Sequence, residues 1–410
     1  MNKQLIRTRV FRYFVEKMYS TCMYIGAIVV LPIVILIRVI APICRIRFGY
    51  FIADRIGHFA FDLEYYLSKN KRDEKFSNVH DYFFLEGRSA NSQLEKICKS
   101  HVRVNQLVRL FYLANRMLPA RSKSEVLPAR ISCESRDKVG LFRKVPCQIQ
   151  LLNSELDRGW KILETLGLQR GDRFVCLMVR DSAYLDKTFS NKDWEYHDFR
   201  DSDIRTYHRA ITELAEKGYW VFRMGKNVKN PLDLKQDKVV DYANLPIRSD
   251  FLDVWLMTNC HFAISTGTGL DSVSDMFRRP VLYLNYDGLP LMVTWAKSLT
   301  FPKRLVWRDS SIELTMKEQF RRLYRHSGEY SQSGIEVVDM TEVEIYEAVL
   351  EMISFIDHKY KDSYQDNDLY NEFWRAYENQ STYKRYHGDR HPDARIGRGY
   401  LVGCRPQFFQ

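Results

Sequence analysis

The chain has 410 residues and a formal net charge of +11, with 45% hydrophobic and 14% aromatic residues. This length leaves room for two or three domains, and the apolar content excludes a disordered chain. Twelve Pro and 19 Gly exclude collagen-like and low-complexity classes. The eight Cys are scattered, without Cys-x-x-Cys or zinc-type spacing, which favours reduced thiols in a cytosolic compartment over a disulfide scaffold or a structural zinc site.

Most of the positive charge lies at the N-terminus. Residues 1–55 carry nine Lys and Arg against Glu16 and Asp54, a net +7, which leaves +4 for the rest of the chain. A basic protein can bind nucleic acid, membranes or acidic ligands. Because the charge beyond residue 55 is nearly balanced and no recognised nucleic-acid module is present, we expect no nucleic-acid partner.

The basic N-terminus flanks a hydrophobic segment, Cys22–Ile37, whose 16 residues carry no charge. A membrane span needs about 20 apolar residues, and Pro32 interrupts this one. Positive charge on both sides favours membrane association, as a short tilted span or a kinked re-entrant helix, with a buried core helix as the alternative. Upstream, an apolar stripe suited to an anionic leaflet consists of Ile6, Val10, Phe14 and Met18.

Residues 1–45 therefore predict a basic amphipathic arm followed by a membrane-associated hydrophobic helix. No small-x-small cleavage site follows the apolar run, so we expect no cleaved signal peptide. We expect attachment to an anionic surface, the cytoplasmic face of the inner membrane. The whole chain should sediment with membranes and a protein without residues 1–45 should not; equal solubility of both would contradict this.

The rest of the chain predicts alternating strands and helices. In the first half, strands are expected over 48–52 and 81–87, with a helix carrying Phe59, Leu63 and Leu67 and a loop and linker over 119–148. The second half is clearer, with helices over 151–166 and 251–257, a capping box at Thr341 and Glu344, and strands over 173–179, 219–222, 261–265 and 280–284. Such alternation implies right-handed crossovers and parallel sheets, so we predict an α/β protein.

Polar residues follow the predicted strands of the second half, where open α/β sheets bind ligands. These are Arg180-Asp181-Ser182, Arg223, the Ser-Thr-Gly-Thr-Gly turn at 265–269, and Asn285-Tyr286-Asp287. Backbone N–H groups and hydroxyls of the turn, at a helix N-terminus, favour an anion such as a diphosphate, and arginines add bidentate contacts. Taken singly, Thr268 reads equally well as a helix cap and the glycines as a tight turn.

Other nucleotide motifs are absent from the sequence. The turn is neither Gly-x-x-x-x-Gly-Lys-Ser/Thr nor Gly-x-Gly-x-x-Gly. Asp201-Ser202-Asp203 matches an Asp-x-Asp metal–nucleotide signature, but a helix follows and no strand precedes it, so Asp201 or Ser202 is predicted to cap that helix. We expect no obligatory metal and no cofactor; chelator-sensitive, Mn²⁺-restored activity would contradict this. His387-Gly-Asp389-Arg-His391 has metal-like residue types but reads as an exposed polar loop.

Several segments together resemble a group of bacterial glycosyltransferases associated with surface-polysaccharide biosynthesis. They are RIGHFAFDLEYYL, CLMVRDSAY, YHDFRDSDIRTYHRAITELAEKGYWVFRMG, SDFLDVWLMTNCHFAISTGTGLDSVSDMFRRPVLYLN and FPK, within residues 46–357. The resemblance implies a GT-B-like architecture of two Rossmann-type domains facing a cleft. The acceptor-side domain would cover 46–150, the nucleotide-sugar donor domain 151–360, and a C-terminal helix and tail 361–410.

The resemblance also implies an activity, transfer of a sugar from a nucleotide-sugar donor to a growing surface glycan or a lipid-linked acceptor. We expect a hexosyltransferase-type, inverting enzyme that works without metal and stabilises the departing diphosphate with arginines, hydroxyls and a helix N-terminus. The expected donor-binding residues are Arg180, Arg200, Arg223, Ser265, Thr266, Gly267, Thr268, Gly269 and Asp271. Arg180 is also a catalytic candidate.

An inverting transfer needs a base for the acceptor hydroxyl. His58, in a loop with Gly57 near the expected acceptor, is the first candidate and Asp62 the second. A structural hydrogen bond is an equally good reading of His58. The alternative function is a non-catalytic nucleotide- or phosphate-binding subunit of a membrane-associated polysaccharide assembly system, which would keep the glycine turn and need no base.

Overall fold

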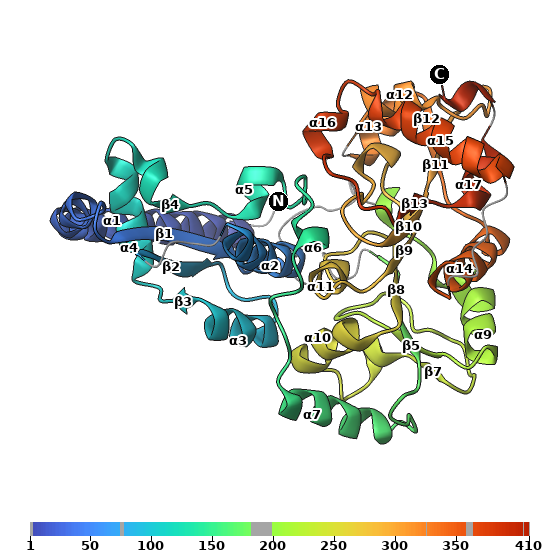
Figure 1. The fold of residues 1–410 in the computed structure, drawn as a ribbon, viewed down its shortest axis with the longest axis horizontal. Coiled ribbons are helices and arrows are strands. Elements are labelled where there is room, and N and C mark those ends of the chain that lie inside the picture. The colour runs from blue at the N-terminus through green and yellow to red at the C-terminus, as the bar shows by residue number, and fades with distance from the viewer. Residues whose placement is uncertain are drawn as a thin grey trace. The chain divides into compact units, whose positions relative to one another are not determined.

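The protein is described by a computed structural model covering residues 3–73, 78–181, 199–324, 326–357, 364–404 and 406–409. The chain forms two compact units, Met1–Ser132 (unit 1) and Cys133–Gln410 (unit 2). Each unit contains a parallel sheet and helices, which confirms the predicted α/β class (Figure 1). The predicted division at residues 45, 150 and 360 stays a prediction.

The sheet of unit 1 has the strand order of a Rossmann half. Its described strands are all parallel and lie in the order β3-β2-β1-β4. The chain builds the sheet outward from β1 to β3 and then returns to the other side of β1, so β1 and β4 flank the switch point. The strands are β1 (Arg45–Ile52), β2 (Val79–Glu86), β3 (Arg103–Val104) and β4 (Glu125–Val126).

Close packing at this switch point explains a glycine in β1. A Cβ added at Gly49 would lie 2.6 Å from the backbone oxygen of Val126 in β4, closer than real Cβ contacts. Any side chain here would push β4 away from β1. The helices of unit 1 are α1 (Lys3–Val39), α2 (Ile56–Arg72), α3 (Ser92–His101), α4 (Val108–Met117), the short η1 (Arg121–Ser124) and α5 (Ala129–Cys133), whose last residue belongs to unit 2.

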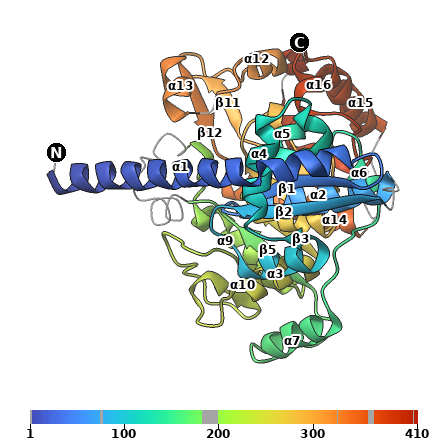
Figure 2. The same cartoon turned by 90° about the vertical axis from the view of Figure 1, so that its left-hand side faces the viewer.

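The predicted hydrophobic helix is present as one long helix, α1, with Pro32 inside it. Figure 2 shows α1 as one uninterrupted ribbon beside α4 and β1. Ala27 and Val34 are fully buried in the same core cluster as Phe48 of β1 and Tyr112 of α4. Residues 17–39 are long and apolar enough to cross a membrane, and 11% of an 18-residue window within them is buried. Because part of α1 belongs to the core of unit 1, deleting residues 1–45 would also disturb the fold, so truncation does not isolate membrane binding.

Unit 2 repeats the same strand order in a longer sheet. Its seven described strands are parallel, in the order β13-β10-β9-β8-β5-β6-β7. The chain builds outward from β5 to β7, then returns to β5 and continues on its other side from β8, so β5 and β8 flank the switch point. The strands are β5 (Phe174–Met178), β6 (Trp220–Arg223), β7 (Val239–Val240), β8 (Phe262–Ser265), β9 (Val281–Tyr286), β10 (Ser298–Pro302) and β13 (Ala394–Ile396).

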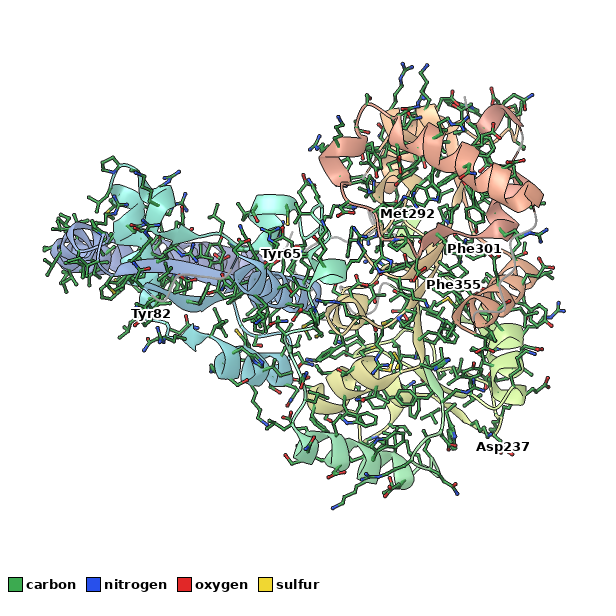
Figure 3. All side chains as sticks on the ribbon, in the orientation of Figure 1. Tyr65, Tyr82, Asp237, Met292, Phe301 and Phe355 are labelled. Carbon is green, nitrogen blue, oxygen red and sulfur yellow. The ribbon has the colours of Figure 1, made fainter. Side chains whose placement is uncertain are left out.

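Helices cover the sheet of unit 2, and the core lies between them. Figure 3 labels three core members, Met292, Phe301 and Phe355. The predicted capping box is confirmed, because Thr341 Oγ1 accepts from Glu344 N at 3.3 Å. A separate antiparallel pair is formed by β11 (Arg304–Trp307) and β12 (Ile335–Val338). The helices are α6 (Leu141–Lys144), α7 (Asn153–Glu164), α9 (His208–Glu216), α10 (Asp250–Asn259), α11 (Asp271–Met276), α12 (Met316–Arg321), α13 (Ser327–Gln332), α14 (Glu342–Ile356), α15 (Tyr364–Glu378), α16 (Tyr383–Tyr386) and α17 (Arg398–Gly403), with short turns η3 (Ile204–Tyr207), η4 (Tyr242–Asn244), η5 (Leu289–Leu291) and η6 (Pro406–Phe409).

The expectation of an exposed polar loop near the C-terminus is wrong for His387, which is 3% exposed. Its Nδ1 lies 3.0 Å from Thr294 Oγ1, and its Nε2 lies 3.0 Å from the Tyr377 hydroxyl and 2.9 Å from the Pro290 oxygen. Burial, and then the nearby Arg136 charge, lower the pKa of His387 to about 3. The neutral ring therefore fastens the C-terminal segment to the core of unit 2.

This burial predicts acid sensitivity. The pKa of His387 is 6.5 in the unfolded chain and about 3 in the folded protein. Below pH 6.5 the unfolded chain therefore binds a proton that the folded protein does not bind. Stability should therefore fall with decreasing pH by about 1.4 kcal/mol per pH unit, about 2 kcal/mol at pH 5. Thermal unfolding from pH 7 to 5 should depend less on pH in His387→Gln than in the wild type or in a control at the exposed His101, His101→Gln. Equal pH dependence in all three proteins would contradict this role.

Candidate functional site

The residues predicted from strand ends lie together at the switch point of unit 2. Strand β5 runs into Arg180, and strand β8 runs into the glycine turn. The two loops are joined directly, because the backbone N–H of Arg180 donates to Thr266 Oγ1 at 2.9 Å. Thr266 N in turn donates to the Met178 oxygen at 3.2 Å. Ser182 lies outside the described residues.

A segment that precedes η3 also reaches Arg180. The Nε of Arg180 donates to Asp201 Oδ1 at 3.2 Å, and Ser202 N donates to the Arg180 oxygen at 3.1 Å. The prediction that Asp201 or Ser202 caps the following helix is wrong, because Asp203 accepts from Arg205 N at 3.0 Å and caps η3. Asp201 instead neutralises part of the charge of Arg180.

Arg200 lies over the glycine turn. Its guanidinium donates to the Gly267 oxygen at 3.1 Å and forms an ion pair with Asp287 at 2.9 Å. A Cβ at Gly267 would lie 3.2 Å from the ring of Tyr286 and 3.9 Å from Arg200 Nη2. The φ of Gly267 is +80°, in the left-handed region. Glycine is therefore required here both by backbone conformation and by the groups that crowd the turn.

Ser265 is the centre of the turn. Its Oγ accepts from Gly267 N at 3.1 Å and from Thr268 N at 3.2 Å, and it donates to Asp271 Oδ2 at 2.8 Å. The expectation that the backbone N–H groups of the turn are free for a diphosphate is therefore wrong for Gly267 and Thr268. Helix α11 has only six residues, so its dipole adds little to an anion site.

Two buried carboxylates lie beneath this turn. Asp271 is 7% exposed, and burial raises its pKa to about 6, while hydrogen bonds from Ser265 and from the Thr268 backbone oppose the rise. Burial, and then the Asp271 charge, raise the pKa of Asp275 to about 8, so Asp275 holds a proton at neutral pH. Asp271 thus positions the turn through its hydrogen bond with Ser265.

Replacing Ser265 with alanine tests whether these bonds hold the turn. The change removes the shared partner of two backbone donors and of Asp271, so we expect a loss of about 1–3 kcal/mol in stability together with weakened ligand binding. Ser274→Ala is the matched control, since Ser274 is buried in α11 and, within the described part of the chain, its hydroxyl makes one bond, to the Met257 oxygen at 3.4 Å. Unfolding in denaturant measures the difference, and equal losses in both variants would contradict a special role for Ser265.

Arg223 lies at the same sheet edge but is 1% exposed. Its guanidinium reaches Asp241 Oδ1 at 3.3 Å and the Asn230 oxygen at 3.1 Å, with Asp181 at 3.9 Å. These contacts tie the end of β6 to the loop that leads to β7. The structure therefore places Arg223 behind the site, as support for the loop.

Among the residues that the structure describes, two cations of the site are partly accessible. The side chain of Arg180 is 17% exposed and that of Arg200 is 26% exposed. Burial, and next the neighbouring Arg200 charge, lower the pKa of Arg180. Two guanidinium groups side by side repel each other, and an anion that bridges them would relieve the repulsion through charge-assisted hydrogen bonds. The Thr268 hydroxyl is weakly engaged, with Met178 Sδ at 3.6 Å. Gly269 follows it in the turn.

Sequence reasoning missed Lys303, which is 4% exposed at the end of β10. Its Nζ donates to the Asp201 oxygen at 2.7 Å and pairs with Asp339 at 2.6 Å. Lys303 therefore fixes the segment that carries Arg200 and Asp201. The same strand-end signal could have found it, but Pro302 weakened the strand pattern before it.

The acceptor-side candidates lie at the switch point of unit 1, where residues 53–55 connect β1 to α2. The expectation that Gly57 and His58 lie in a loop is wrong, because both belong to the first turn of α2. Burial, and then Arg130 and Arg55, lower the pKa of His58 to about 4, so its ring is neutral at neutral pH. Asp62 is 1% exposed and its Oδ1 accepts from the backbone N–H of Arg130 at 3.2 Å. Asp62 thus holds the start of α5, and His58 is the better placed candidate for accepting a proton.

Within the described ranges, no group of three or more His, Cys, Asp or Glu could hold a metal ion. Metal independence stays a prediction. All eight cysteines are free thiols. Fold and site together define a protein of two Rossmann-type units with a cationic cluster at the switch point of the second.

No protein-family model matches the chain, and no curated protein matches it in sequence. Among solved structures it is similar to E. coli ADP-heptose lps heptosyltransferase II, at 12% identity over 77% of this chain and 99% of that chain, with a TM-score of 0.43. The family 9 glycosyl transferase from Veillonella parvula DSM 2008 matches at 10% identity over 63% and 86% of the two chains, with a TM-score of 0.41. A protein described as a UDP-N-acetylglucosamine 2-epimerase from Listeria monocytogenes matches at 10% identity over 88% and 94%, with a TM-score of 0.31. Likeness at this level assigns no activity to the chain.

Proposed function

We propose that this protein is a glycosyltransferase that moves a sugar from a nucleotide-sugar donor to a growing surface glycan or a lipid-linked acceptor. The observation that carries the proposal is the pair of partly exposed guanidinium groups, Arg180 and Arg200, against the glycine turn at the switch point of unit 2. A donor diphosphate is negatively charged, and two neighbouring guanidinium groups can each donate hydrogen bonds to its oxygens. The sequence resemblance to polysaccharide-associated glycosyltransferases supports the same assignment.

The proposed reaction is a direct displacement at the anomeric carbon. The bond from the sugar to the diphosphate oxygen breaks, a bond to the acceptor oxygen forms on the opposite face, and His58 takes the acceptor proton. Arg180 and Arg200 stabilise the charge that develops on the leaving diphosphate, while Ser265, Asp271, Arg223 and Lys303 hold the loops that position them. With this cationic cluster the reaction needs no metal. The proposed transferred sugar is a hexose.

A second candidate is a non-catalytic nucleotide- or phosphate-binding subunit of a membrane-associated assembly system. The internal ion pairs favour it, because Arg180 and Arg200 already contact Asp201 and Asp287. Such pairs can hold a binding loop in place without any turnover.

The experiment that separates the two candidates measures nucleotide release and thermal stabilisation with UDP-, GDP-, CMP- and ADP-sugars, ADP-heptose included. Ligand binding raises stability by RT ln(1 + [L]/Kd). We expect one donor to stabilise the protein and to release its nucleotide, with rates unchanged by EDTA. Stabilisation without release, even with lipid-extract acceptors, would favour the non-catalytic subunit. No stabilisation by any donor would contradict both.

A further inference from the structure

Helix α1 leaves a broad apolar face uncovered. Within residues 17–39, an 18-residue window has a mean hydropathy of 2.5, yet only 11% of that window is buried. A continuous apolar face of this size on a folded unit is typical of a surface that contacts another molecule or a membrane. The face is formed by side chains that are 50–71% exposed, Met18, Ile25, Ile28, Val29, Ile33 and Leu36.

The opposite side of α1 packs on the protein. Ala27 and Val34 are fully buried, and a Cβ at Gly26 would lie 2.9 Å from Leu110 of α4. Farther along, the Arg38 guanidinium donates to Asn115 Oδ1 at 2.8 Å and to the Asn115 oxygen at 3.0 Å. A helical stripe from residue 26 to 38 is therefore fixed to unit 1, over about 18 Å of helix length.

This packing opposes a membrane-spanning orientation. If α1 crossed the bilayer, the strands packed against it would enter the hydrocarbon with it. The parallel sheet is open at both edges, and unpaired backbone groups of a sheet edge are not tolerated in lipid. The same strands also carry the bidentate ion pair of Arg47 with Asp81, at 2.8 Å for each bond.

The charge of the chain is divided between the units in a way that fits an anionic surface. Unit 1 contains 22 Lys and Arg against ten Asp and Glu, a net +12, which leaves unit 2 with 40 against 41, a net −1. A second copy of this chain on the same face would bring two strongly positive units together and would be repelled. An anionic leaflet attracts the same charge. Exposed basic residues flank the apolar segment 17–39, with Lys17 at its start and Arg45 and Arg121 near its end.

We infer that α1 lies in the plane of one leaflet of an anionic membrane, with its exposed face at the boundary of headgroups and acyl chains, and does not cross the bilayer. The sequence allowed either a tilted span or a re-entrant helix. In the inferred orientation both ends of α1 stay on the same side of the membrane, as they would in the re-entrant helix. This orientation deepens the membrane attachment assumed in the proposed function and is independent of sugar transfer.

The depth of four positions along α1 tests the orientation. Met18, Ile25, Val29 and Leu36 lie on one line of the helix surface, and the outer two are about 27 Å apart along the axis. A fluorescent amino acid placed singly at each position in the full chain, with vesicles of brominated phosphatidylglycerol and phosphatidylethanolamine, reports depth by quenching. An in-plane helix predicts equal depth at all four positions. A depth that changes steadily along the helix by tens of ångströms would overturn the inference.

A charge on the exposed face tests the surface itself. Val29→Glu should weaken sedimentation with phosphatidylglycerol-containing vesicles by at least about tenfold, because a carboxylate must then leave water. Val343→Glu is the matched control, an exposed valine of α14 that should bind as wild type does. Nucleotide-sugar stabilisation should be the same in both variants, which keeps this test separate from the donor site and shows that each is folded. Unchanged sedimentation of Val29→Glu, or a dimer in light scattering that this variant abolishes, would overturn the inference.

Discussion

Replacing Arg180 with alanine is expected to slow nucleotide release from the donor by about 10²–10³-fold, the usual effect of removing one preorganised donor to a developing negative charge. The guanidinium is partly exposed, and the backbone of Arg180 is held by Thr266 at the junction of β5 and β8. Arg180→Lys keeps the charge but cannot form two parallel bonds, so its rate should be intermediate. The measurement is release of nucleotide diphosphate under saturating donor.

Arg170→Ala provides the control for Arg180. Arg170 is about half exposed and pairs with Asp157 at 2.8 Å and Glu164 at 3.6 Å. Its loss should leave the rate unchanged. Because Asp201 loses a partner in Arg180→Ala, thermal unfolding must show that the variant remains folded. A folded Arg180→Ala protein that turns over as fast as Arg170→Ala would remove Arg180 from the mechanism.

Replacing His58 with alanine is expected to slow transfer to the acceptor by about 10²–10⁴-fold, as for other general bases. His58→Gln separates the catalytic role from a structural one. Glutamine preserves the size and hydrogen bonding of the ring but takes no proton, so it should be as slow as alanine. Transfer restored by glutamine, or an alanine variant within about threefold of wild type, would show that His58 is a structural residue.

The pH profile of transfer gives an independent test of His58. With a pKa of about 4, its ring is neutral above that value and protonated below it. The rate should therefore be constant from pH 5 to 8 and should fall as the pH drops through about 4. The low pKa also makes the ring a weak base, which limits the rate it can support. A fall in the rate as the pH drops through 6–7 would identify another group as the base.

The strands at the switch point of unit 2 were predictable because they are buried on both faces. Every residue of β5 and of β8 is buried, and such continuous apolar runs are recognisable in sequence. Strand β4, only Glu125–Val126, fell in a segment predicted as loop and linker, because two residues carry no periodicity. Without β4, the switch point of unit 1 was not visible.

The direction of individual hydrogen bonds was beyond the sequence. The Ser-Thr-Gly-Thr-Gly turn identified the right place, but not that Ser265 takes up the N–H groups of Gly267 and Thr268. His387 was misjudged for the same reason, because one of its partners, Thr294, lies 93 residues away. Hydroxyl and imidazole groups satisfy themselves through tertiary contacts that neither spacing nor composition reveals.

The hydrophobic helix was predictable as a helix but not as part of a core. Its 16 uncharged residues indicated membrane association, whereas the buried stripe of Ala27 and Val34 depends on α4, about 80 residues later. The extent of the basic region was likewise underestimated from the sequence. Residues 1–55 accounted for +7, but unit 1 as a whole carries +12, more than the net charge of the entire chain.

The measurement that tests the central claim most directly is hydrogen–deuterium exchange of the full chain with and without the nucleotide-sugar that stabilises it. A donor held by Arg180 and Arg200 should slow amide exchange in the glycine turn, 266–270, and in the segments around 180 and 200, with the largest change at amides that Ser265 does not hold. Arg180→Ala should abolish this protection. Protection confined to unit 1, or the same protection in Arg180→Ala, would contradict a donor site at the switch point of unit 2.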